Sequence, residues 1–147
     1  MTASPASRAV AVQRASLVPI QWLKAHEDFV ETRVLEVLAN FQRSGVVDFA
    51  VVADAATGTV VDGHHRLEAL RRLGALFVPA YLVDYRDPAI TVRGWREGEA
   101  VPTKEDVLRH AAEGKLYPPK TTRHDFVRVM DPVDVPLAEL VDERTVR

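Results

Sequence analysis

The sequence of 147 residues contains no cysteine. Without thiols the chain has no disulfide framework, no thiolate metal site and no cysteine nucleophile. It also has no apolar run approaching the roughly 20 residues of a membrane span. The N-terminal stretch MTASPASRAVAVQRAS lacks the continuous apolar segment of a secretory signal. We therefore expect a cytoplasmic protein with no membrane partner.

An excess of basic charge is missing as well. The formal net charge of −2 gives no general attraction to nucleic acid, so no nucleic-acid partner is expected. The pattern GxxxxGK[ST] of a P-loop does not occur, so any phosphate site must be built in another way. What is present is ordinary: 47% hydrophobic and 27% charged residues are typical of one globular domain.

Hydrophobic periodicity predicts one α/β domain over residues 16–141, between flexible tails at 1–15 and 142–147. Helices are expected at 31–44, 64–73 and 103–112, and strands at 17–20, 46–53, 59–61 and 77–83. Pro79 favours an edge position or an irregularity for the last of these strands. Residues 84–102 are expected to be mostly loop, and 134–140 to form one final turn.

The stretch VVDGHHRLEALRRLG, residues 60–74, predicts a strand, a tight turn and a helix in direct succession. A helix N-terminus attracts phosphate, and Arg66 adds a cation with fork geometry. Asp62 has three open readings: it caps the helix, holds Mg²⁺ or accepts a proton. A histidine metal site has weaker support, because adjacent histidines lack the spacing that places two ligands on one helical face.

Two other polar segments carry candidate functional residues. His26-Glu27-Asp28 is either an exposed polar loop ahead of a helix or the source of a general base, Glu27. The segment PPKTTRH, residues 118–124, is either a stiff proline connector or an anion clamp. Trp95 is expected to belong to the core, as tryptophan usually does, and His110 is expected to be a surface residue of its helix.

These residues resemble a known superfamily. The segments LVPIQWLKAHE, VVADAATGTVVDGHHRLEALRRLGA and VPAYLVDY resemble the ParB/sulfiredoxin fold, which implies a compact α/β domain with a small mixed sheet and flanking helices. Within it, DGHHR with the early HE and the late PPKTTRH resembles the free L-serine kinases. The resemblance covers roughly residues 17–124 and implies phosphoryl transfer from ADP or ATP to the hydroxyl of free serine.

Position by position, the resemblance implies a role for each motif. Glu27 would act as the catalytic carboxylate on the serine hydroxyl, and Asp62 would assist proton removal or organise Mg²⁺. The nucleotide phosphates would lie against Gly63, His64, His65 and Arg66. The amino-acid pocket would use Trp95, and the serine carboxylate or phosphate groups would be held by Lys120, Thr121, Thr122, Arg123 and His124.

Several rivals can be weighed on the same residues. A sulfiredoxin needs a reactive cysteine beside the arginine, where this chain has His65. A chromosome-partitioning ParB would be expected to carry a helix-turn-helix domain and a dimerisation tail, for which the stretch after His124 is too short. The runner-up is a ParB-like nucleotide- or DNA-binding regulatory module without kinase activity, and a metal-dependent nuclease comes third. The donor nucleotide, the exact hydroxy amino acid and the oligomeric state are left open.

Overall fold

The structure is a computed structural model that describes residues 14–126 and 130–141. Most of the two expected tails, residues 1–13 and 142–147, therefore lies outside the described residues. The helices are η1 (Ile20–Trp22, a 3-10 turn), α2 (Glu31–Ser44), α3 (His64–Arg72), α4 (Lys104–Glu113) and α5 (Leu137–Val141). The strands are β1 (Ser16–Pro19), β2 (Val46–Val47), β3 (Val51–Asp54), β4 (Val60–Asp62), β5 (Phe77–Val83), β6 (Thr91–Arg93), β7 (Arg123–Asp125) and β8 (Val135–Pro136).

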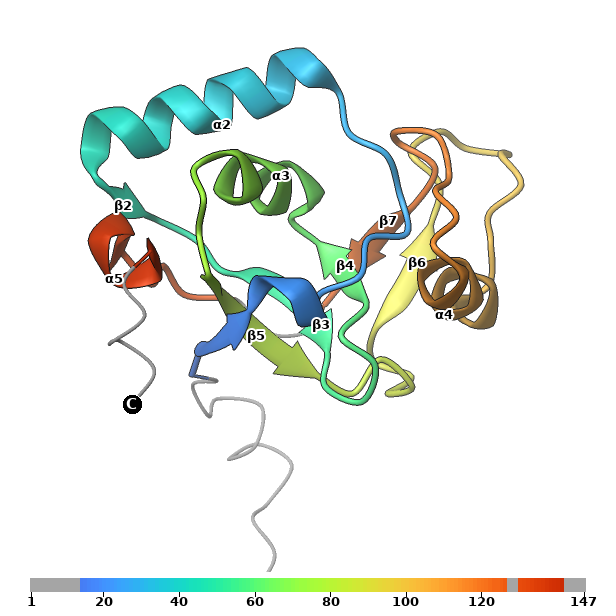
Figure 1. The fold of residues 1–147 in the computed structure, drawn as a ribbon. Coiled ribbons are helices and arrows are strands. Elements are labelled where there is room, and N and C mark those ends of the chain that lie inside the picture. Colours follow the sequence, from blue (N-terminus) through green and yellow to red (C-terminus); the bar gives the residue numbers. More distant parts are fainter. Residues whose placement is uncertain (1–13, 127–129, 142–147) are drawn as a thin grey trace, which may run out of the picture.

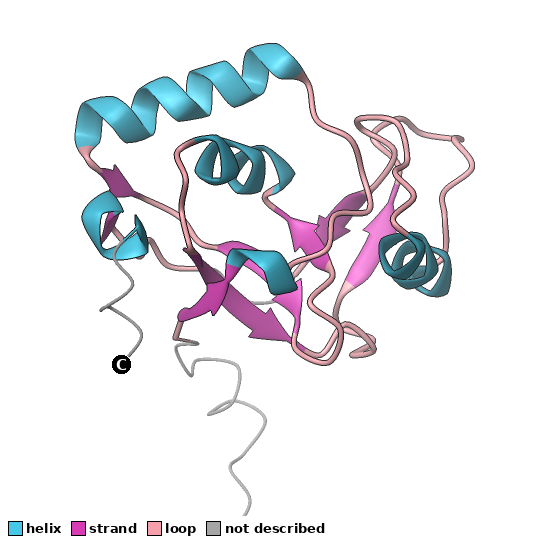
Figure 2. Cartoon of the chain, in the orientation of Figure 1, coloured by secondary structure: helices cyan, strands magenta, loops and turns pink. Residues whose placement is uncertain are grey.

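A mixed sheet of four strands, in the order β1-β5-β3-β4, forms the centre of the fold. The pairs β1–β5 and β3–β4 are antiparallel, and β3–β5 is parallel. Two small antiparallel pairs, β2–β8 and β6–β7, lie outside it. The predicted α/β class with a small mixed sheet and flanking helices is confirmed (Figures 1 and 2).

The central strand β3 separates two apolar layers. Val51 and Ala53 belong to the core that includes buried residues of α2, α3 and α5, whereas Val52 packs in a second core with Tyr85 and Val107 of α4. Successive side chains of a strand point to opposite faces, so β3 is buried on both sides. Figure 1 shows α2 and α3 together on one side, with α4 beside β6 and β7 on another.

The helix boundaries follow the predicted signals closely. Gly45 ends α2 in the left-handed conformation with φ of 75°. Thr103 begins α4 with a capping box, in which its hydroxyl accepts from the N–H of Asp106 and the Asp106 carboxylate accepts from the N–H of Thr103. None of the described helices is long and apolar enough to cross a bilayer.

The single strand predicted over 46–53 is wrong. The chain leaves one pairing and joins another between β2 and β3, because Asp48 redirects it. The Asp48 carbonyl accepts from the N–H of Val133 at 2.7 Å, and its carboxylate accepts from the N–H of Phe49 at 2.9 Å. β2 thus pairs with β8 and only β3 enters the main sheet.

The edge position favoured for the strand of Pro79 is also wrong. β5 is an interior strand of the sheet, with Pro79 opposite Leu17 of β1. Each residue of a strand directs its N–H to only one neighbour, so one proline removes a single ladder bond. The remaining pairs of this seven-residue strand, four of whose residues are buried, outweigh that loss.

Candidate functional site

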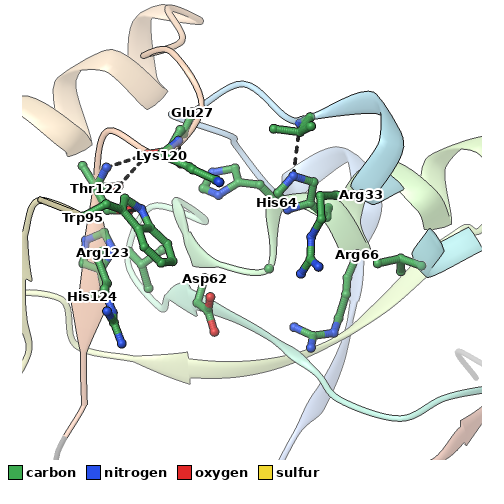
Figure 3. Close-up of a pocket in the computed structure, with 15 residues that line it drawn as sticks. Glu27, Arg33, Asp62, His64, Arg66, Trp95, Lys120, Thr122, Arg123 and His124 are labelled. Atoms are coloured by element: carbon green, nitrogen blue, oxygen red, sulfur yellow. Dashed lines mark hydrogen bonds between the residues drawn. The ribbon is translucent and has the colours of Figure 1, made fainter. Parts of the chain in front are cut away.

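The three polar segments meet at one pocket of about 600 Å³ (Figure 3). We call one part the loop side; it consists of Glu27, Trp95, Lys120, Thr122, Arg123 and His124. We call the other part the helix side; it consists of Arg33, Asp62, Gly63, His64, His65 and Arg66. Of the predicted site residues only Thr121 does not line the pocket, since its hydroxyl donates to the Pro118 carbonyl at 2.6 Å.

Glu27 is held by the loop that follows Pro118-Pro119. Its carboxylate accepts from the N–H of Lys120 at 3.1 Å, and from the N–H and the hydroxyl of Thr122 at 2.8 Å each. Lys120 adopts a positive φ of 62°, which is uncommon for a residue with a side chain. Burial raises the pKa of Glu27, while the Thr122 and Lys120 donors counteract the rise. The result is a half-buried carboxylate that faces a polar pocket.

The two adjacent histidines accept backbone hydrogen bonds from the segment that carries Glu27. The N–H of His26 donates to Nε2 of His64 at 3.3 Å, and the N–H of Val30 donates to Nε2 of His65 at 3.1 Å. Both rings must therefore be unprotonated at Nε2. Burial lowers the pKa of both imidazoles, in agreement with neutral rings. This pair fastens residues 26–30 to the start of α3.

His26 is fully buried, so the reading of residues 26–28 as a simple exposed loop is wrong. Its ring makes edge contacts with His64 and His124, at 4.6 and 5.8 Å between ring centroids. Burial lowers the pKa of His26 to about 4 and that of His124 to about 3. His124 Nε2 also lies 2.7 Å from the Tyr85 hydroxyl. This imidazole cluster is consequently neutral near pH 7.

The start of α3 opens into the pocket. Gly63 is its N-cap, with φ of 102°, and a Cβ there would lie 2.9 Å from Cγ1 of Val51. A side chain is thus excluded both by conformation and by space. The reading of Asp62 as a capping residue is wrong, because no side chain caps this helix. Asp62 instead ends β4 with an exposed side chain that lines the pocket (Figure 3).

Four cationic side chains line the pocket beside the two carboxylates of Glu27 and Asp62; they are Arg33, Arg66, Lys120 and Arg123. Sequence reasoning missed Arg33 and assigned no role to His26, although it singled out the segment His26-Glu27-Asp28. Arg33 comes from the first turn of α2, and only the packing of α2 on α3 brings it here. The only sequence feature that drew attention to His26 was its place next to Glu27, in a polar segment between two apolar elements. The excess of cations suits a ligand with several negative charges.

Trp95 lies at the rim of the pocket and not in the core, since half of it is exposed. Its indole N–H donates to the Thr122 carbonyl at 3.1 Å, and the Arg123 guanidinium lies 5.1 Å from the ring centroid. His110, expected at the surface, is only partly exposed. Its ring stacks on Tyr117 at 3.8 Å, and its Nδ1 is buried without a partner among the described residues.

The described residues contain no group of three or more histidine or acidic side chains that could enclose a metal ion. Mg²⁺ in phosphate-transfer sites usually needs only one or two carboxylates, because substrate phosphates and water complete its shell. The exposed Asp62 carboxylate, beside the N-terminus of α3, fits that requirement. A histidine-bound metal does not fit, since Nε2 of both His64 and His65 is already engaged.

No protein-family model matches the chain. A solved structure of a free serine kinase in complex with AMP superposes with a TM-score of 0.79, at 19% identity, covering 88% of this chain and 95% of that one. The chain has the fold of the free serine kinases. At this identity the likeness concerns the fold alone, and it agrees with the resemblance of the motifs.

Sequence comparison leads to the same group. An ATP-dependent L-serine kinase of Staphylothermus marinus is 34% identical over 83 residues, which are 54% of this chain and 33% of that protein. An ADP-dependent L-serine kinase, SerK, of Thermococcus kodakarensis is 27% identical over 101 residues, 66% of this chain and 42% of that protein. The chain thus matches less than half the length of these relatives.

Proposed function

We propose that this protein is a free L-serine kinase, which transfers a phosphoryl group from ATP or ADP to the serine hydroxyl and yields O-phospho-L-serine. One observation carries the proposal: a half-buried carboxylate, Glu27, shares a pocket with a helix N-terminus and with Arg33 and Arg66. Phosphoryl transfer needs positioned phosphates, cations to balance their charge and a base beside the acceptor hydroxyl. The start of α3, the cationic side chains and Glu27 would supply these without a P-loop.

The helix side would bind the nucleotide. The first N–H groups of α3 and the Arg66 guanidinium, which lines the pocket, would bind the anionic oxygens, and His64 and His65 would support them through their remaining ring N–H groups. Asp62 would hold Mg²⁺ together with the phosphates. When bound, that ion would balance the negative charge that builds up in the transferring group.

The loop side would bind serine. Glu27 would accept the proton of the serine hydroxyl as the oxygen attacks phosphorus. Lys120, Arg123 and His124, with Trp95 at the rim, would hold the carboxylate and ammonium groups or the phosphate. Thr121 would contribute through the shape of its loop, since its hydroxyl is bonded within it. The partners would be two small molecules, a nucleotide and a free amino acid, and the protein would act in the cytoplasm.

The test is a phosphorylation assay with the purified chain. Serine, threonine and homoserine would each be incubated with ATP or ADP and Mg²⁺, and phospho-amino acids would be measured by mass spectrometry. We expect O-phosphoserine with at least one nucleotide and a loss of product in EDTA. The names of the two relatives include both donors, so the assay compares them directly. If no amino acid is phosphorylated with either nucleotide, the proposal is wrong, and a gel shift would then test the regulatory DNA-binding alternative.

A further inference from the structure

A chain of hydrogen bonds runs from the core of the sheet to the carboxylate of Glu27. His26 Nδ1 lies 2.8 Å from the Val60 carbonyl, and its Nε2 lies 3.1 Å from Oγ1 of Thr122. The same Thr122 hydroxyl lies 2.8 Å from Oε1 of Glu27. Three of these groups are buried, because His26, Val60 and Thr122 are at most 7% exposed. The chain therefore connects Glu27 to the interior and not to solvent.

Counting protons along this chain reveals a conflict. A carbonyl only accepts, so His26 must carry its proton on Nδ1, and the neutral ring then presents a lone pair at Nε2. Thr122 has one hydroxyl proton but faces two acceptors, Nε2 of His26 and the ionised carboxylate of Glu27. While Glu27 is ionised, the Thr122 hydroxyl can serve only one of the two, and the buried Nε2 of His26 is then left without a donor among the described residues, because Oε1 of Glu27 also accepts from the N–H of Thr122.

One additional proton satisfies every member of the chain. If Glu27 is protonated on Oε1, its O–H donates to Thr122 and the Thr122 O–H turns to His26 Nε2. We propose that His26 is a positioning residue which, through Thr122, makes Glu27 a stronger base by completing the chain when Glu27 takes up a proton. This inference rests on the proposed function, because it concerns the carboxylate that would deprotonate serine.

The transfer step balances. The serine O–H bond breaks and a Glu27 O–H bond forms, while a serine O–P bond forms and the bond from phosphorus to the bridging oxygen of the nucleotide breaks. ATP leaves as ADP, or ADP as AMP. The proton remains on Glu27, donated toward Thr122, until product release exposes the carboxylate to water. His26 keeps its Nδ1 proton bonded to Val60 throughout and gains a donor at Nε2.

Other ionisable groups face this chain. His64 and His124 lie beside the ring of His26, and His110 also acts on it electrostatically. Lys120, Arg33 and Arg123 line the pocket with Glu27. Burial raises the pKa of Glu27 independently of the chain. The test must therefore observe Glu27 itself and not only the overall dependence of turnover on pH.

The test is the titration of Glu27 by carbon-13 NMR of labelled carboxyl groups, without substrates, in the wild type and in His26→Asn. Asparagine can still donate to the Val60 carbonyl but presents nothing to Thr122. We expect the Glu27 pKa to fall by about one unit, the size of one hydrogen bond, with about a tenfold lower kcat and an unchanged nucleotide Kd. His124→Asn, the loss of a neighbouring buried imidazole outside the chain, should shift Glu27 much less. An unchanged or higher Glu27 pKa in His26→Asn overturns the inference.

A second pair of variants keeps the inference testable if His26→Asn does not fold. In the wild type and in Thr122→Ser, the nitrogen-15 resonance of His26 Nε2 should shift in step with the titration of Glu27. In Thr122→Val, which removes only the hydroxyl link, it should not. A response that persists in Thr122→Val, or is missing from the wild type, overturns the inference. Because these titrations need no turnover, intact coupling without serine phosphorylation would refute the proposed function alone.

Discussion

The two sides of the pocket differ in how far their polar groups are already bonded. On the loop side, the Glu27 carboxylate takes three donors and the Trp95 indole donates to the loop that surrounds it. On the helix side, neither the Asp62 carboxylate nor the Arg66 guanidinium forms an ion pair or hydrogen bond with another described residue. Glu27 and Trp95 on the loop side are thus held in place before any ligand arrives, whereas Asp62 and Arg66 on the helix side keep their charges available for one.

This contrast predicts different consequences of substitution. A change on the loop side should alter the rate or the stability of the fold, because it breaks contacts that already exist. A change at Asp62 or Arg66 on the helix side should alter ligand affinity and leave the fold nearly unaffected, because neither side chain forms a hydrogen bond or ion pair with another described residue. The following predictions test that division.

Glu27→Gln should have the largest effect. Glutamine keeps the size of the side chain but cannot take up a proton, so serine phosphorylation should fall by about 100-fold or more. Nucleotide affinity, measured by calorimetry, should stay within about twofold, since Glu27 belongs to the loop side. Glu113→Gln, on the exposed end of α4, is the matched control. Wild-type turnover in Glu27→Gln would remove Glu27 from the mechanism.

Acid should destabilise the protein, because the buried imidazoles of His26 and His124 must take up protons. The pKa of His26 in the folded protein is about 4, below its ordinary value of 6.5. Between these two pH values the unfolded chain therefore binds more protons than the folded protein. Its contribution to stability is complete above pH 6.5 and is lost as the pH falls toward 4. By pH 5 the loss should be on the order of 2 kcal/mol for His26, with a similar loss for His124. Urea denaturation at pH 5 and above pH 6.5 measures this loss. An equal free energy of unfolding under both conditions would contradict a neutral imidazole cluster.

Arg66→Ala should weaken nucleotide binding about tenfold, the value of one charge-assisted contact, without changing the midpoint of thermal unfolding by more than about 2 °C. Arg71→Ala is the control on the same helix, because Arg71 pairs with Glu68 and does not line the pocket. Equal affinity in Arg66→Ala and Arg71→Ala, by calorimetry, would show that the start of α3 does not bind phosphate through Arg66.

Trp95→Ala should have the smallest effect. Half of this residue is exposed, and its one hydrogen bond goes to the loop backbone. We expect the KM for serine to rise about threefold to tenfold with little change in kcat, as when binding alone is weakened. Trp95→Phe keeps a ring for Arg123 but lacks the N–H, so its KM for serine should lie between those of the wild type and Trp95→Ala. A large fall in kcat would mean that Trp95 orients the reacting groups.

The sequence predicted most of the fold because its strongest signals are local. Glycines after the helices, the Thr103 cap and the turn at Asp62-Gly63 act within a few residues, and the structure has helices where they indicate. The errors came from long-range contacts. Asp48 divides the predicted strand through bonds to Val133, which no local pattern reveals.

The candidate site was predicted in part for the same reason. The motifs that carry Glu27, Asp62 and the 118–124 loop could be recognised from the sequence. The bonds of Glu27 to Lys120 and Thr122 could not, because these residues are separated by 93 and 95 positions and meet only in the fold. Arg33 lies on α2, and the hydrophobic periodicity of that helix predicts only which face is apolar. Nε2 of both His64 and His65 accepts from a backbone N–H, so only the other ring nitrogen of each is left for a phosphate. Charge and spacing do not show which backbone a side chain will meet.

The bonds from His26 and Val30 to the histidine pair also have an evolutionary consequence. His64 and His65 hold the segment that carries Glu27, but neither of their contacts involves the Glu27 side chain. A descendant that lost only this glutamate would keep the fastened segment and the pocket beside α3. On the proposed function, such a protein would still bind a nucleotide but would no longer transfer its phosphoryl group. A single substitution would thus change a kinase into a nucleotide-binding protein. If the proposed function is correct, the residue after His26, and not the DGHHR turn, would separate an active kinase from a protein that only binds the nucleotide.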